Sequence, residues 1–112
     1  MEAPLRATFR LTLLPAGAPD ISGGSPFTQT FAETPDYWIA IGLDPDLDEA
    51  MKRAVRQSIR FLSESLGMHR ATAYAYLSAA TDFEVSQVVD RTKGVHALIR
   101  KQDFAAATTP WP

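Results

Sequence analysis

Hydrophobic and polar residues alternate along the first part of the chain. Residues 5–13 carry Leu, Ala or Phe at every odd position and Arg or Thr at every even position. A period of two is typical of a β-strand with one buried face and one wet face, and it predicts a strand near residues 5–14. Residues 15–26 then hold three prolines and three glycines, which predicts a long loop.

A second pattern joins a strand to a helix. Residues 37–43 form a continuous apolar and aromatic run between turn residues, which predicts a buried strand. Asp44 or Asp46 can then cap a helix, and apolar residues recur at steps of three and four until Gly67, a residue suited to a left-handed cap. The pattern predicts an amphipathic helix that ends at Gly67.

A third pattern predicts a second helix and a hairpin. Residues 70–81 are apolar around most of a helical circumference, which favours a helix sandwiched between layers or between subunits. Residues 83–90 and 94–100 alternate again around a turn at residues 91–94, which predicts a β-hairpin. The tail is rich in Ala, Thr and Pro, and we expect it to fray.

These elements predict one α+β domain. Two helices would pack on an antiparallel or mixed sheet built from strands near residues 5–14, 37–43, 83–90 and 94–100. We expect the domain to span residues 1–102, followed by a flexible tail at residues 103–112.

The composition is that of an ordinary globular domain. The 112 residues are 46% hydrophobic and 21% charged, with a formal net charge of −2. The chain has no cysteine, which excludes disulfides and thiolate chemistry, and no apolar run near the length of a membrane span. The prediction is a cytoplasmic protein that binds neither a membrane nor nucleic acid.

The sequence offers few candidate catalytic or metal-binding residues. Asp44, Asp46 and Asp48 have the spacing of calcium-loop ligands, but Glu49 stands where such a loop needs glycine, so capping is the favoured role. His96 is expected on the polar face of the last strand, beside Asp90 across the turn. The two are candidates for an acid–base pair, but a solvent-facing cross-strand pair is the favoured interpretation, because the sequence places no nucleophile or third group beside them. His69 is expected to cap or flank the second helix, and the sequence predicts no metal site.

One segment has the pattern of a DNA-binding helix-turn-helix. In residues 66–77 a glycine turn precedes Arg70 and an aromatic helix. The negative net charge and the strands predicted on both sides argue against DNA binding. The basic residues of the first helix alternate with acidic ones, which indicates a solvated helix face.

Several spaced motifs resemble a known enzyme family. They run in order over residues 33–101: Glu-Thr-Pro-Asp at 33–36, Gly-Leu-Asp-Pro-Asp-Leu-Asp-Glu-Ala-Met at 42–51, Gln-Val-Val-Asp at 87–90, and Lys-Gly-Val-His at 93–96. This series is similar to the C-terminal region of the acetamidase/formamidase family, metal-associated hydrolases that release ammonia from short linear amides.

The resemblance implies an incomplete enzyme. A complete member is about three times this length, and its metal-associated, amide-cleaving machinery belongs mainly to the region that precedes this segment. The chain is therefore expected to be a C-terminal segment or split subunit acting on C–N bonds of small amides, with zinc or another divalent metal only in the complete enzyme. It would associate with an amidase partner chain or with itself, and the apolar second helix favours a homo-oligomer. The alternative is a non-catalytic binding or oligomerisation module.

Overall fold

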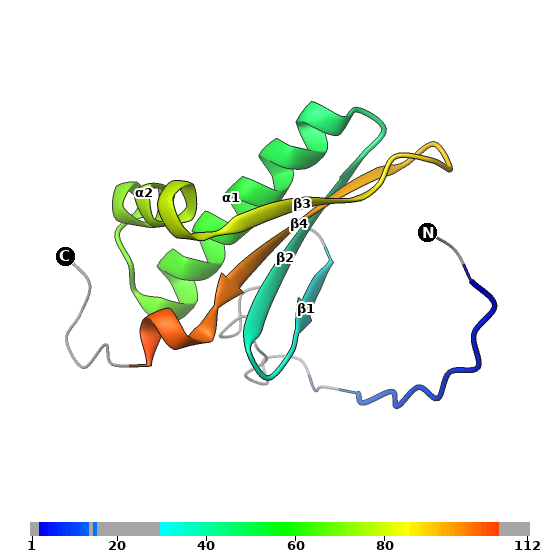
Figure 1. The fold of residues 1–112 in the computed structure, drawn as a ribbon. Helices are drawn as coiled ribbons and strands as arrows, with labels where there is room; N and C mark the ends of the chain where they lie inside the picture. The colour runs from blue at the N-terminus through cyan, green and yellow to red at the C-terminus, as the bar shows by residue number, and fades with distance from the viewer. Residues whose placement is uncertain (1–2, 14, 16–29, 106–112) are drawn as a thin grey trace.

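A computed structural model describes residues 3–13, 15 and 30–105 of the chain. In order, the elements are β1 (Phe31–Glu33), β2 (Tyr37–Asp44), α1 (Leu47–Leu66), α2 (Arg70–Ala80), β3 (Asp82–Gln87), β4 (Lys93–Arg100) and the short 3-10 helix η1 (Lys101–Phe104). The strands form one antiparallel sheet in the order β1-β2-β4-β3. The two helices pack on this sheet (Figure 1), which confirms the α+β prediction and makes the sheet antiparallel.

The predicted strand near residues 5–14 is wrong over the residues that can be compared. Residues 3–13 hold neither strand nor helix and are exposed, and Leu14 lies outside the described residues. The fourth strand is instead β1, only three residues long, which pairs with β2 through Phe31 and Ala40. Alternation predicts which side chains of a strand would face the core. Whether the segment forms a strand at all depends on whether a neighbouring strand offers it a free sheet edge. Most of the predicted loop at residues 15–26 is likewise outside the described part.

The first helix begins and ends where its sequence predicts. The Asp46 carboxylate accepts a hydrogen bond from the Glu49 backbone nitrogen at 3.0 Å, and Gly67 closes the helix with a left-handed φ of 69°. Asp44 accepts from the Asp46 nitrogen at 2.9 Å and pairs with Arg53 at 2.8 Å. The aspartates at positions 44 and 46 therefore organise the helix start, as the sequence predicts.

The second helix is covered on one side in the single chain. Ala73 and Leu77 are buried, whereas the Tyr74 side of the helix is exposed. The His69 side chain accepts from the Ala71 backbone nitrogen at 3.3 Å, so its predicted capping role is confirmed. A subunit on the exposed side of α2 stays a prediction.

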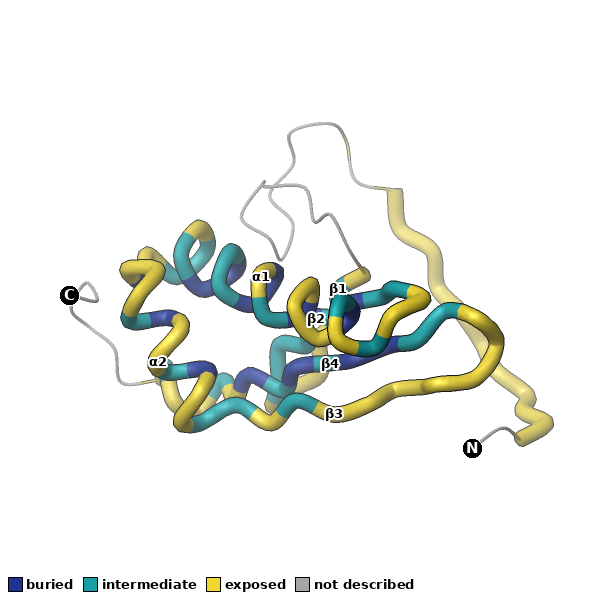
Figure 2. Tube along the Cα trace, turned by 90° about the horizontal axis from the view of Figure 1, so that it is seen from above, coloured by how far each residue is buried: buried dark blue, intermediate teal, exposed yellow. Residues whose placement is uncertain are grey.

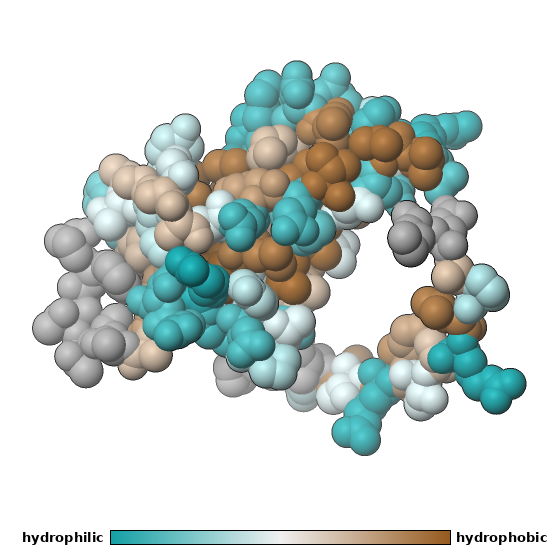
Figure 3. Space-filling view, in the orientation of Figure 1, coloured by the Kyte–Doolittle hydropathy of each residue, from teal (hydrophilic) through white to brown (hydrophobic). Residues whose placement is uncertain are grey.

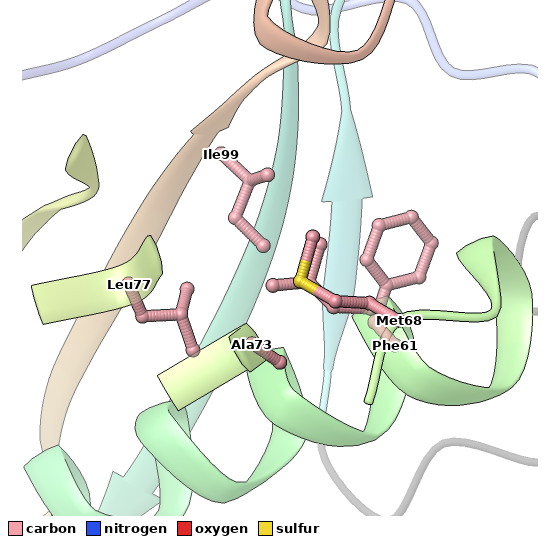
Figure 4. Packing of buried hydrophobic residues seen from close by; sticks show 6 residues of the cluster. Phe61, Met68, Ala73, Leu77 and Ile99 are labelled. Carbon is pink, nitrogen blue, oxygen red and sulfur yellow. The ribbon is translucent and has the colours of Figure 1, made fainter. Parts of the chain in front are cut away.

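The core lies between the helices and one face of the sheet. Its main cluster joins side chains of α1, α2 and β4 with the residue that connects the helices (Figure 4): Phe61, Leu62, Met68, Ala73, Leu77 and Ile99. A smaller cluster of Ala50, Ala54 and Val95 continues it toward the start of α1. Phe104 packs against the rings of Trp38 and Tyr76, so the end of η1 belongs to the folded body although it falls in the predicted tail.

Candidate functional site

His96 on β4 makes two polar contacts with β3. Its Nδ1 lies 2.7 Å from the Ser86 hydroxyl oxygen, and its Nε2 lies 3.3 Å from a carboxylate oxygen of Glu84. The His96 side chain is 23% exposed and that of Glu84 is 57% exposed. A hydroxyl, an imidazole and a carboxylate therefore form one continuous chain on the surface of the sheet.

The hairpin geometry brings these three residues together. Glu84 stands directly opposite His96 in the strand register, and an irregularity between Val85 and Gln87 shifts the pairing next to it. A bulge of this kind re-aims the neighbouring side chains, and Ser86 lies at this point, within reach of His96. Sequence alternation could have found Glu84, because it predicts the same face for both residues, but the bulge leaves no clear pattern in the sequence.

Asp90 does not pair with His96 as the sequence pattern predicts. It lies in the turn with a left-handed φ of 63°, next to Arg91 at 72°. The Thr92 nitrogen donates to the Asp90 carbonyl at 2.8 Å, and the Gln87 side-chain amide donates to the Thr92 carbonyl at 2.7 Å. Two successive left-handed residues suit a tight hairpin turn, so the structure assigns Asp90 to turn formation.

The contacts among Ser86, His96 and Glu84 determine which ring nitrogen of His96 carries the proton. An ionised carboxylate only accepts hydrogen bonds, so the Nε2 that faces Glu84 carries the ring proton in the neutral imidazole. The Nδ1 of that tautomer accepts from the Ser86 hydroxyl. The arrangement has the parts of a nucleophile, a base and an orienting carboxylate. Because Glu84 is more than half exposed, water screens its charge and weakens this effect.

An apolar surface surrounds His96. In antiparallel pairs opposed residues point to the same face, which places His96 beside Ile41 on the side of the sheet opposite the buried core residues Val95 and Ala97. The same side carries four partly exposed apolar side chains: Ile39, Ile41, Leu43 and Leu98. We call these four residues with His96, Ser86 and Glu84 the open sheet face. Figure 3 shows hydrophobic side chains gathered along the strands and out to the hairpin tip.

A second polar cluster lies at the other end of the sheet. An open hollow of about 350 Å³ is lined by residues of the β1–β2 turn and of the β4–η1 junction, among them Tyr37, Arg100 and Lys101. Its cations are paired: Arg100 lies 3.3 Å from Asp103, and Lys101 lies 2.5 Å from Glu33. Because each cation has a carboxylate beside it, the positive charge that could attract an anion into the hollow is largely neutralised.

Tyr76 connects this cluster to the helices and has a shifted pKa. Its hydroxyl donates to an Asp103 carboxylate oxygen at 2.8 Å. Burial, together with the hydrogen bond to Asp103 and the charge of that residue, raises the pKa of Tyr76 from 10.0 to about 12. Folding thus favours the neutral phenol.

We expect this shift to make the domain lose stability in alkali. A pKa that is raised on folding contributes stability that is complete below the unfolded value and is lost as the pH rises through the folded value. The window runs from about pH 10 to about pH 12. Urea unfolding followed across that window should show a smaller loss for Tyr76→Phe than for the wild type. The control Tyr74→Phe, at an exposed position of the same helix, should keep the wild-type slope, and equal slopes for all three proteins would contradict the assignment.

Basic residues on the first helix form ion pairs with acidic residues of the same helix. On α1, Lys52 lies 2.7 Å from Glu49, and Arg60 lies 3.1 Å from Glu64. Some of the basic residues of α1 therefore have acidic neighbours on the helix surface, as expected of a solvated helix face.

Within residues 3–13, 15 and 30–105, no three His, Cys, Asp or Glu side chains gather in a way that could hold a metal ion. None of the helices described has the length and apolar content needed to cross a membrane.

Fold and site define an α+β domain that carries a surface hydroxyl–imidazole–carboxylate chain beside an apolar sheet face. Compared with models of known protein families and with curated proteins, the chain matches none.

Proposed function

We propose that this chain is the C-terminal segment or a split subunit of an acetamidase/formamidase-like hydrolase, and that it is catalytically incomplete alone. The substrates would be short linear amides, whose C–N bond is hydrolysed with release of ammonia. The motifs of residues 33–101 suggest this family. A cytoplasmic location belongs to the same proposal.

The observation that carries the proposal is the open sheet face. His96, Ser86 and Glu84 lie there among partly exposed apolar side chains rather than in an enclosed cavity. Small-molecule sites are usually concave and bury most of their ligand. A second protein surface laid over this face would exclude water and strengthen the contacts of His96. This chain would then supply one wall of the site.

Within that wall, each polar residue has a distinct task. The Ser86 hydroxyl is the group that a bound amide would meet, because both ring nitrogens of His96 are already engaged. His96 accepts the hydroxyl hydrogen, and Glu84 holds the ring in the required tautomer. The described residues do not fit a zinc site, so we assign any divalent metal of the complete enzyme to the missing region.

Ammonia release from formamide and acetamide tests the proposal. The purified chain should release no ammonia above background, with or without zinc. After co-expression with the preceding region of an acetamidase/formamidase-type enzyme, the assembled pair should hydrolyse at least one of the two amides. A stable assembled pair without activity would overturn the proposal, and so would turnover by the isolated chain.

Variants of the assembled pair test the role of the open sheet face. Ser86→Ala and His96→Gln should each lower kcat by about 10²-fold or more if these groups act on the substrate. Asp90→Asn is the matched control, since Asp90 belongs to the turn in the same hairpin, and it should retain activity. If Ser86→Ala and His96→Gln kept full kcat, the face would be an interface without a catalytic role.

A further inference from the structure

The segment of residues 3–13, which we call the N-terminal arm, exposes an unusual amount of apolar surface. It holds neither strand nor helix, and its large apolar side chains are almost fully exposed: Leu5 87%, Phe9 84%, Leu11 95% and Leu13 93%. In Figure 1 the arm runs apart from the sheet. A segment that alternates in this way has one face suited to a sheet, and leaving that face in water is unfavourable.

Within the described part of the chain, one sheet edge has no strand paired on its outer side. β3 is an outer strand of the sheet, and five of its six residues are exposed. Figure 2 shows β3 exposed over most of its length beside β4, which is buried or half-buried over most of its length. Val85 on this strand is 54% exposed. An exposed edge of this kind presents free backbone groups and is a ready template for another strand.

The arm and the edge match in both hydrophobicity and charge. Along β3 the acidic residues Asp82 and Glu84 alternate with Phe83 and Val85. Along the arm Arg6 and Arg10 alternate with apolar residues. Paired strands place opposed side chains on the same face. Arg6 and Arg10 are four residues apart and Asp82 and Glu84 only two, so an added arm would set one arginine opposite a carboxylate and the other diagonal to the second carboxylate. The other face of the arm would extend the apolar row of β3.

We propose that the arm of one copy adds as a strand to the outer side of β3 in a second copy, and that the exchange is reciprocal. A reciprocal exchange closes into a two-fold dimer, the commonest symmetry of soluble oligomers. A second copy is the occupant because the single chain leaves its own arm extended and away from its own β3. The backbone pairing uses the outer edge of the sheet, and it shares only Glu84 with the residues assigned to the open sheet face.

A charge exchange between two variants tests the proposal. One variant carries Arg6→Glu and Arg10→Glu, and so combines an acidic arm with an acidic edge. The other carries Asp82→Lys and Glu84→Lys, and so combines a basic arm with a basic edge. Light scattering coupled to size-exclusion chromatography should give a dimer for the wild type and the mass of one chain for each variant alone. An equimolar mixture should return to the dimer mass, because both arm–edge contacts are then complementary.

The control variant Lys52→Glu with Arg56→Glu changes the charge by the same amount as the arm variant, on the exposed side of α1. This control variant should remain dimeric.

Amide hydrogen exchange in residues 5–13 should be slowed in the wild type and in the mixture, and fast in the arm variant. The proposal is overturned if the wild type has the mass of one chain, if the arm variant stays dimeric, or if mixing folded variants leaves the mass unchanged. Ammonia release plays no part in this readout, so either proposal can fail without the other.

Discussion

Replacing Gly42 by Ala should destabilise the domain by about 3 kcal/mol or more, at the upper end of the cost of overpacking a core. A Cβ at position 42 would overlap the carbonyl oxygen of Ala50 and the backbone nitrogen of Ala54. Both belong to the backbone of α1 and cannot turn away as the end of a side chain can. The helix would have to lift from β2 along its length, which would open the smaller core cluster.

Urea unfolding of Gly42→Ala against wild type measures this effect. Gly94→Ala is the matched control in the adjacent strand, because its Cβ would meet the flexible Leu43 side chain at 3.2 Å and the Ser86 Cβ at 3.3 Å. The control should lose clearly less stability, since those neighbours can shift by a few tenths of an ångström. A loss below about 1 kcal/mol for Gly42→Ala would contradict the described contact between α1 and β2.

Replacing Phe61 by Ala should cost about 3–5 kcal/mol, the usual range for deleting a buried aromatic side chain. Phe61 is 2% exposed and its ring joins three elements. The ring centroid lies 5.1 Å from that of Phe31 on β1 and 5.2 Å from that of Trp38 on β2. Its loss would leave a cavity between α1 and the sheet and would release β1, which is only three residues long.

Two measurements separate these consequences. The midpoint of urea unfolding reports the global loss, and amide hydrogen exchange in residues 31–33 reports the release of β1. Met51→Ala on the same helix is the control, because Met51 is 37% exposed, and its truncation should cost well under half as much. A similar loss for both variants, or unchanged exchange in β1, would show that Phe61 does not hold this edge strand.

Local sequence signals predict both helices and the hairpin well. Asp46 and Gly67 mark the ends of α1 because capping and a left-handed backbone depend on residues next to one another in the chain. His69 starts α2 for the same reason. The alternation of Val95, Ala97 and Ile99 predicts the buried face of β4, since a strand exposes its two faces with a period of two.

Long-range signals are weaker in the sequence. The sequence pattern predicts Asp90 as the partner of His96, but the register and the bulge bring Glu84 and Ser86 to it instead. A bulge inserts one extra residue, so each residue beyond it points to the opposite face of the sheet from the one that simple alternation predicts. The residue types at positions 85–87 give no signal of a bulge. Alternation likewise predicts a strand near residues 5–14, but it does not show whether a sheet edge is available to pair with that strand. In the structure the three residues of β1 take the place beside β2.

By itself the sequence determined the capped helices, the strand after residue 36, the hairpin near residues 83–100, the α+β class and the absence of disulfides, because all of these follow from residue chemistry and short-range spacing. The tertiary structure alone decided which strands pair, which face of the sheet remains open, and which carboxylate and hydroxyl meet His96. These features arise where segments far apart in the chain come together, and the free energy of such contacts depends on packing and register that no local pattern specifies.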